Sequence, residues 1–348
     1  MNRDNTVSAG ESATMSGGTI VVRVESDRSH ARRNLGSLIL LGLLAASVMM
    51  NLALIAGSAV SDSSLNTVRQ VHRDGSLDSQ NKIAVIRFSG TIMPPFTDRW
   101  IKQIRHAAED DVVQGVLLEI DSPGGLVADS HQIYHELQKL RVIKPVYVAM
   151  KRMAASGGYY VAMGAGPDGL VFAEPTTWTG SIGVILPRYN AAELASNLGV
   201  KTEPLVTGPL KGSLSPFRDL REDERVVWET IIDDSFRRFI AVIADNRKSL
   251  DTESVKKLAT GQVYTTTQAI QNGLVDETGF VDDAITALAE SLNLADYEVV
   301  DYTSPTGLIE VLLGSQESPP GILDRLLQAG VPRAFYYCSW NPVIPVRR

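Results

Sequence analysis

Short apolar runs alternate with longer amphipathic segments over most of the chain, and this alternation constrains the fold more than any other feature. The runs at 82–88 (KIAVIRF), 114–120 (QGVLLEI) and 145–150 (PVYVAM) are typical of strands, and QGVLLEI is apolar enough for burial on both faces of a parallel sheet. The segments between them, 97–110 and 127–141, carry apolar residues at helical spacing. Strands that alternate with helices are joined by parallel crossovers, so the sequence predicts an α/β fold.

The same alternation predicts the remaining elements. Strands are expected at 170–173, 183–186 and 204–206, and helices from Ser156 and over 190–198, 222–248, 252–259 and 281–291. These elements form one folded domain, which we place at 82–300. The segment 301–348 has prolines between short apolar runs, which is typical of an extension that packs on a surface or on a neighbour.

The N-terminal part contains a long apolar segment, with no charged residue between Arg33 and Asp62. A bilayer core of ~30 Å is spanned by about 20 helical residues, whereas the apolar part of a signal peptide has roughly 7 to 15. We therefore predict one transmembrane helix, a signal anchor at 35–60. The small residues at 57–59 (GSA) leave a cleaved signal peptide as the alternative.

The charges that flank this segment predict its orientation. Arginines are denser before the segment than after it, which by the positive-inside rule places residues 1–33 in the cytoplasm and the rest of the chain outside. Residues 1–33 and 61–81 are polar and lack periodicity, so we expect a disordered cytoplasmic tail and a juxtamembrane linker. The lipid bilayer is thus an expected partner.

Composition excludes several other kinds of partner. The net charge is −7, and no basic cluster is interleaved with aromatic residues, so nucleic acid is not expected. The single cysteine, Cys338, excludes an internal disulfide and a cysteine-based zinc site. His131 and His135 are four residues apart on a predicted helix but lack the glutamate of the H-E-x-x-H zinc motif. We expect neither a metal nor a cofactor.

Two glycine-rich segments are candidates for chemistry. Residues 121–125 (DSPGG) join a predicted buried strand to a helix, and adjacent glycines let backbone amides approach a ligand, as an oxyanion hole requires; the alternative is an ordinary turn. In 153–160 (MAASGGYY), Ser156 stands between two alanines and two glycines at a strand-to-helix junction. Small neighbours leave a serine open to a substrate, although close packing of the helix would need them too.

A serine nucleophile also needs a base, and the histidines are not well placed to supply one. Lys211 lies in a turn-rich segment with no acidic residue within seven positions on either side. A lysine acts as a base only when it is neutral, which requires burial to lower the pKa of an amine from about 10.4 toward 7 or 8. A solvated loop lysine is the alternative.

Six segments follow one another in a distinctive order: SPGG (122–125), AASGGYY (154–160), TGSIGV (179–184), SPFR (215–218), GQVYT (261–265) and AIQNGLVD (269–276). In this order they resemble the signal peptide peptidase A (protease IV) family of bacterial membrane-bound Ser-Lys peptidases, over about 82–289. The resemblance implies a ClpP/crotonase-like spiral of ββα units. The site residues that it implies are Ser156 as nucleophile, Lys211 as general base, Ser181 hydrogen-bonded to that lysine, and an oxyanion hole from Gly157, Gly124 and Gly125.

The resemblance also implies where the protein acts and on what. The substrates would be apolar peptides, chiefly signal-peptide remnants left after secretion, and the location would be the bacterial cytoplasmic (inner) membrane with the catalytic domain outside. The family forms dome-shaped rings, and its longer members hold two such domains that share one dyad. Because this chain has one such domain, we expect a homo-oligomeric ring in which Lys211 reaches Ser156 of a neighbouring subunit.

Two functions of other classes are the alternatives. A crotonase-type acyl-thioester enzyme would use the same spiral fold and a two-amide oxyanion hole, but a domain outside the cytoplasm would have no supply of coenzyme A. A catalytically idle membrane scaffold is disfavoured by the intact Ser156 and Lys211, because an idle site has no reason to keep a lysine whose burial is costly.

Overall fold

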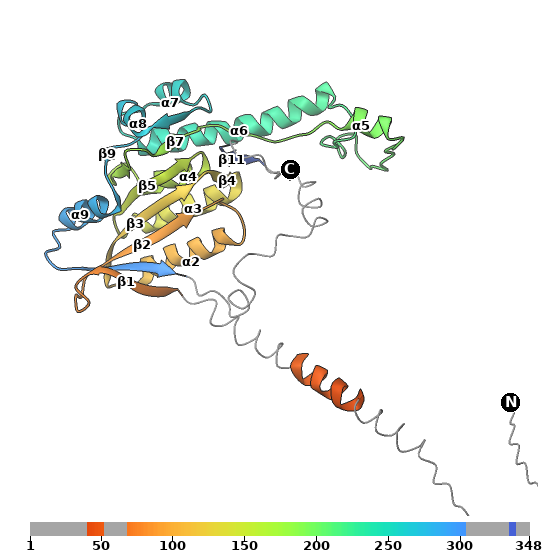
Figure 1. Cartoon of the computed structure of the whole chain (residues 1–348). Coiled ribbons are helices and arrows are strands. Elements are labelled where there is room, and N and C mark those ends of the chain that lie inside the picture. Colours follow the sequence, from red (N-terminus) through yellow and green to blue (C-terminus); the bar gives the residue numbers. More distant parts are fainter. Residues whose placement is uncertain (1–39, 52–67, 304–333, 339–348) are drawn as a thin grey trace, which may run out of the picture. The chain divides into compact units, whose positions relative to one another are not determined.

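The computed structural model describes residues 40–51, 68–303 and 334–338 (Figure 1). They belong to two compact units, one within 1–60 and the other within 61–348. In the first unit, residues 40–51 form a helix. Among the residues just given, no helix combines the length and the apolar character that a membrane span needs. The predicted cytoplasmic tail and much of the predicted anchor at 35–60 lie outside the described residues.

A nine-stranded sheet forms the centre of the second unit. Its strands are β1 (Arg69–Gly75), β2 (Lys82–Ser89), β3 (Val113–Ser122), β5 (Val146–Ala155), β6 (Val171–Ala173), β7 (Trp178–Gly180), β8 (Val263–Thr265), β9 (Glu277–Thr278) and β10 (Glu298–Thr303). The order is β1-β10-β2-β3-β5-β6-β9, and β7 pairs with β5 and β8. The pairs β1–β10 and β7–β8 are antiparallel, and the other pairs in this sheet are parallel. A second, antiparallel sheet joins β4 (Gly124–Leu126) to β11 (Phe335–Tyr337).

Helices pack on both faces of the sheet, which confirms the predicted α/β class. The helices described in this unit are α2 (Phe96–Glu109), α3 (Val127–Leu140), α4 (Gly157–Ala162), α5 (Ala192–Asn197), α6 (Glu222–Asn246), α7 (Thr252–Leu258), α8 (Thr266–Gln271) and α9 (Val281–Ser291). Successive residues of β3 face opposite sides. Val116 and Leu118 join the core cluster that includes α2, α3 and α4, whereas Leu117 joins the cluster that includes α9. Burial on both faces therefore explains the continuous apolar run.

The two halves of α6 have different surroundings. Phe239 and Ile243 in its C-terminal half are buried, whereas Val226, Val227 and Ile231 in its N-terminal half are exposed. Figure 1 shows the N-terminal half projecting away from the sheet together with α5. We call residues 186–228 the arm.

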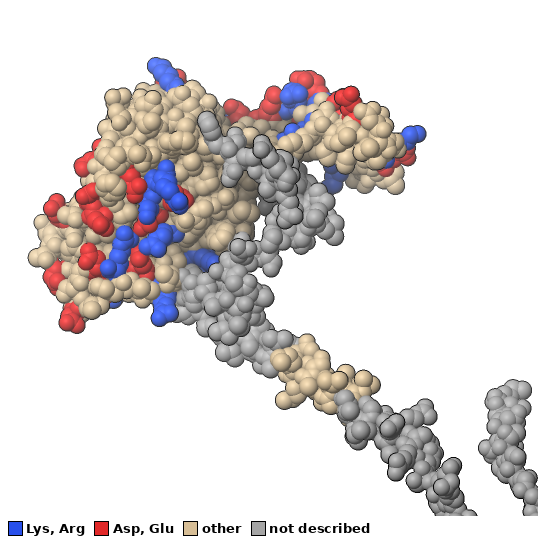
Figure 2. Space-filling view, in the orientation of Figure 1, with Lys and Arg blue, Asp and Glu red and all other residues tan. Residues whose placement is uncertain are grey.

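A buried carboxylate on the central strand β3 joins several strands of the sheet. The carboxylate of Glu119, which is 3% exposed, lies 2.9 Å from Arg73, 3.2 Å from Arg87 and 3.4 Å from Lys151. Burial by itself would raise the pKa of Glu119, but the hydrogen bond from Arg73 and the charge of Arg87 lower this pKa overall. Figure 2 shows Lys and Arg side chains mixed with Asp and Glu on this part of the surface. The network links β1, β2 and β5 to β3.

Three predictions at the level of elements are wrong. β1 lies inside the predicted linker at 61–81, so the folded unit begins before residue 82. This strand pairs with β10 at the edge of the sheet and is mostly exposed, so its sequence lacks the apolar signal of a buried strand. The runs at 183–186 and 204–206 form no strand; Ile185 makes a single bridge, to Phe335.

Candidate functional site

Ser156 lies where β5 ends and α4 begins. Its φ of 55° and ψ of −114° are values that residues other than glycine rarely adopt. The N–H of Ser156 donates to the carbonyl of Gly180 (2.8 Å), and its carbonyl accepts from the N–H of Tyr160 (2.9 Å). A residue in such a conformation costs about 1–3 kcal/mol and persists only where the surrounding structure holds it. The fold thus imposes this turn on the serine.

The hydroxyl of Ser156 differs from those of nearby serines. Ser156 is 1% exposed, and its Oγ has no hydrogen-bond partner among the described residues. Ser122 Oγ donates to Gly90 (2.6 Å), and Ser130 Oγ donates to Leu126 (2.9 Å). A buried hydroxyl without a partner costs about 1–3 kcal/mol, so native structures keep few of them. Such a group is typical of a site that is completed by another molecule.

The Gly124–Gly125 turn packs directly against Gly157. A Cβ on Gly124, whose φ is 97°, would lie 2.6 Å from the nitrogen of Gly157, and a Cβ on Gly157 would lie 3.0 Å from the nitrogen of Gly125. Side chains at these positions would therefore separate the two segments. The N–H of Gly124 donates to Ser122 Oγ (3.1 Å).

The amides of Gly125 and Gly157 are therefore the better candidates for an oxyanion hole. Gly157 begins α4, so its N–H has no acceptor within the helix. Both nitrogens lie beside Ser156, where donors aimed at a developing negative charge would stabilise a tetrahedral intermediate. Gly124 contributes indirectly, because its lack of a side chain lets the glycine turn lie close to Gly157.

Ser181 lies next to Ser156 on the neighbouring strand. β5 and β7 pair in parallel with Ala155 opposite Gly180, so the next residues of the two strands are neighbours, at a strand spacing of about 4.8 Å. Ser181 is 7% exposed and has a φ of 50°, and its N–H donates to the carbonyl of Gln262 (2.7 Å). The fold thus brings together two strained serines.

Lys211 is placed elsewhere, in the arm, and it is exposed. The loop around it is tied to the first turns of α6. The guanidinium of Arg218 donates both to the carbonyl of Gly212 (2.7 Å) and to the carboxylate of Glu224 in α6 (2.8 Å), and the indole of Trp228 donates to Ser213 Oγ (2.9 Å). With a helical rise of 1.5 Å per residue, Trp228 lies about 16 Å along the axis from Phe239, where α6 meets the core.

The structure therefore brings together Ser156, Ser181 and the three glycines, but not Lys211. Because no described residue is a hydrogen-bond partner of Ser156 Oγ, Lys211 does not reach the serine within the single chain. Among the described residues of the single chain, none contacts Ser156 Oγ as a base would.

β11 is the part of the site that sequence reasoning missed. Phe335 exchanges two backbone hydrogen bonds with Ile185 (2.9 and 3.0 Å), and on its other side β11 pairs with β4. The strand thus lies between the glycine turn and the segment that follows Ser181. Its signal in the sequence is the aromatic run FYY, which has high strand propensity but stands in a proline-rich extension.

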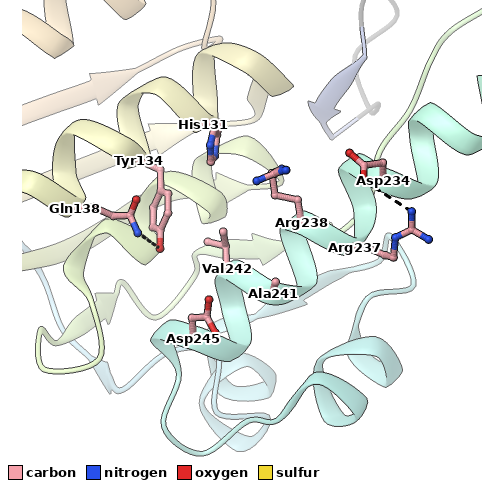
Figure 3. A pocket seen from close by; sticks show the side chains of 9 residues that line it. All are labelled: His131, Tyr134, Gln138, Asp234, Arg237, Arg238, Ala241, Val242 and Asp245. Carbon is pink, nitrogen blue, oxygen red and sulfur yellow. Dashed lines mark hydrogen bonds and ion pairs between the residues drawn. The ribbon is translucent and has the colours of Figure 1, made fainter.

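A separate cavity of about 460 Å³ lies between α3 and α6 (Figure 3). Ser156 does not line it, so we do not place the chemistry there. His131 lines it, and His131 Nδ1 is 2.8 Å from the hydroxyl of Tyr160. Burial, followed by the charge of Arg238, lowers the pKa of His131, which favours neutral imidazole. Within the described ranges no three His, Cys, Asp or Glu residues are grouped as metal ligands.

Two protein-family profiles match parts of the chain that contain these residues. The profile of peptidase family S49 matches residues 138–295, a range that includes Ser156, Ser181 and Lys211. The profile of the Clp protease family matches residues 73–178, which include the glycine turn. The second match supports a ClpP-like α/β fold.

Three relatives have names that refer to proteolysis. The chain is 38% identical over 219 residues to a putative signal peptide peptidase SppA of Enterococcus faecium, 33% identical over 265 residues to the putative protease slr0021 of Synechocystis sp., and 34% identical over 264 residues to Protease 4 of Salmonella typhi. These alignments cover 62%, 76% and 73% of this chain, and 62%, 93% and 42% of the respective relatives. The chain thus spans less than two thirds of the Enterococcus and Salmonella proteins.

Proposed function

Because the chain belongs to peptidase family S49, we propose that it is a serine endopeptidase in which Ser156 is the nucleophile and Lys211 is the general base. One observation carries the proposal. The hydroxyl of Ser156 is buried without a partner on a strained turn, beside the amides of Gly125 and Gly157. This arrangement suits a nucleophile with its oxyanion hole already formed.

The reaction follows from these positions. Neutral Lys211 Nζ removes the proton from Ser156 Oγ as the oxygen attacks the carbonyl carbon of the scissile bond. The resulting oxyanion accepts hydrogen bonds from the amides of Gly157 and Gly125. The lysine ammonium then gives its proton to the leaving amine, and a water molecule that the neutral lysine deprotonates hydrolyses the acyl-enzyme. Ser181, adjacent to Ser156, accepts a hydrogen bond from the lysine and orients it.

A homo-oligomeric ring would supply the lysine. Lys211 is exposed on the arm and makes no hydrogen bond with its own Ser156, so we place it against Ser156 of a neighbouring subunit, where burial would favour the neutral amine. The arm carries exposed apolar residues that such a contact would cover: Leu194, Leu198, Val200, Leu205, Val206, Leu210 and Phe217.

We place the protein in the bacterial cytoplasmic membrane, acting on apolar peptides and chiefly on signal-peptide remnants. The uncharged stretch between Arg33 and Asp62 supports a single-pass anchor at 35–60, with the peptidase domain outside. The name of the Enterococcus faecium relative supports the substrate class.

Hydrolysis of an apolar signal-peptide fragment by the full-length chain in detergent, measured from pH 6 to 10, tests the proposal. We expect activity to rise with pH as the catalytic lysine becomes neutral, and Ser156→Ala to lose about 10³-fold or more. Ser291→Ala, an exposed serine at the end of α9, is the matched control and should keep full activity. An active Ser156→Ala variant would refute the assignment, and an inactive wild type would favour the scaffold function.

A further inference from the structure

Two backbone carbonyls that flank Lys211 are each held by an arginine of the arm. The guanidinium of Arg218 donates to the carbonyl of Gly212 (2.7 Å), and the guanidinium of Arg221 donates to the carbonyl of Pro209 (3.1 Å). Pro209 precedes Lys211 by two positions, and Gly212 follows it directly. The backbone of the proposed base is therefore fixed on both sides by side chains from one short segment.

Both arginines are held by one carboxylate. Glu224, in the first turn of α6, is 0% exposed, and its side chain accepts two hydrogen bonds from Arg218 (2.8 and 2.5 Å). The guanidinium of Arg221 lies 3.3 Å from Glu224 Oε1, and the backbone N–H of Arg221 donates to Glu224 Oε2 (3.0 Å). A buried carboxylate with such partners is confined to one position, because moving it would leave its charge unpaired. We call Glu224, Arg218 and Arg221 the clamp.

The loop that carries Lys211 is a series of tight turns. The N–H of Lys211 donates to the carbonyl of Gly208 (3.1 Å), and the N–H of Ser213 donates to the carbonyl of Leu210 (3.2 Å). The indole of Trp228, one helical turn after the clamp, donates to Ser213 Oγ (2.9 Å). The side chain of Lys211 itself is exposed. The loop thus fixes the backbone of the lysine and leaves its amine available to another molecule.

We propose that Glu224 is a positioning residue for the reaction, because through the two arginines it holds Lys211 where the amine can reach Ser156 of a neighbouring subunit. The inference rests on the proposed function. A general base acts within hydrogen-bond reach of the proton that it removes, about 2.6–3.2 Å, and a misplacement of about 1 Å can lower a rate about 10²-fold. The clamp sets the position of the lysine within its own chain, before the subunits meet.

Glu224→Gln in the full-length chain tests the clamp, because it removes the charge and keeps the size of the side chain. We expect kcat for the apolar signal-peptide fragment to fall about tenfold, because the lysine is held less firmly. KM should change less than about twofold, because the variant leaves the serine and its oxyanion hole intact. Light scattering should give the subunit count of the wild type. An unchanged kcat, or a loss of assembly, would overturn the positioning role.

Two neighbours on the same helix give matched controls. Glu222 is an exposed carboxylate that pairs with Arg225 (3.5 Å) outside the clamp, so Glu222→Gln should keep full activity. Arg218→Ala should reproduce the loss of kcat seen in Glu224→Gln, whereas Arg225→Ala should keep full activity. Equal losses in the two arginine variants would overturn the inference, because they would attribute the effect to the net charge of the arm.

Mixed oligomers show which subunit needs the clamp. Ser156→Ala subunits supply the lysine and Lys211→Ala subunits supply the serine, so Glu224→Gln can be added to either. Added to the subunit that supplies the lysine, it should lower the recovered activity about tenfold, and added to the other it should have no effect. Equal losses in both mixtures would overturn the positioning role and leave the proposed function intact. Absence of recovered activity without Glu224→Gln would overturn both the shared dyad and this inference.

Discussion

Ser156 and Lys211 are held by the rest of the chain in different ways. Ser156 is buried at the end of a central strand, in a conformation fixed by backbone hydrogen bonds to Gly180 and Tyr160. Lys211 is exposed on the arm, and the contacts of its loop run to the first turns of α6. A nucleophile and its oxyanion hole need a rigid setting within one chain, whereas a base can be delivered by assembly. Under the proposed function, each chain would form the nucleophile and its oxyanion hole and would receive the base from a neighbour.

The largest effect is expected on the arm. Lys211→Ala should lower kcat/KM about 10³-fold or more, because the serine loses its base, while the secondary structure and subunit count stay unchanged. Lys201→Ala removes another exposed lysine of the same arm and should keep full activity. Peptide hydrolysis and light scattering measure the two properties, and an active Lys211→Ala variant would contradict the assignment of the base.

A slightly smaller effect is expected at the glycine turn beside Ser156. Gly124→Ala should lower kcat/KM about 10²-fold, because the added Cβ would separate the glycine turn from Gly157 and displace an oxyanion donor. Gly90→Ala is the matched control. Gly90 also has a positive φ, 87°, but an added Cβ there meets no atom within 4 Å, so this variant should lose stability and not activity. Equal activity losses in the two variants would attribute the loss to backbone strain at a positive φ and not to the oxyanion hole.

Removal of the neighbouring hydroxyl should have an intermediate effect. Ser181→Ala should lower kcat about tenfold, because the lysine loses the acceptor that orients it, and should shift the rise of activity toward lower pH, because the ammonium form loses an acceptor that stabilises it. The pH dependence of kcat is the measurement. A loss of activity without any change in the pH profile would assign Ser181 a purely structural role.

The smallest expected effect is a loss of stability of the arm at acid pH. The hydrogen bond from Arg218 lowers the pKa of Glu224 from 4.5 to about 2. Because the folded-state pKa is the lower one, this ion pair stabilises the arm above pH 4.5 and is lost as the pH falls toward 2. Trp228, whose indole contacts Ser213, should change its fluorescence in that window, and Glu224→Gln should remove the transition. A transition that is the same in the variant would assign it to other carboxyl groups.

The sequence predicted the central strands and helices better than the arm and the short strands β1 and β11. The junction at Ser156 is local, since a buried strand runs into small residues and a helix, and this pattern was enough to place the serine. The short strands β1 and β11 depend on partners far along the chain, Glu298–Thr303 and Gly124–Leu126, so local patterns could not pair them.

The separation of Lys211 from Ser156 was also beyond a local pattern. The apolar positions of α6 form a broken stripe in the sequence, and Val226, Val227 and Ile231 in its N-terminal half are exposed in the single chain. An apolar stripe in a sequence does not show whether residues of the same chain or of another chain cover it.

A mixing experiment tests the shared dyad most directly. Full-length Ser156→Ala and Lys211→Ala, each inactive alone, are combined in equal amounts, allowed to exchange subunits, and tested for peptide hydrolysis. If Ser156 of one subunit uses Lys211 of the next in a ring, about a quarter of the sites pair an intact serine with an intact lysine, so about a quarter of wild-type activity should return. If both residues act within one chain, no mixture contains a complete site. Absence of any recovered activity in verified mixed oligomers would contradict the account.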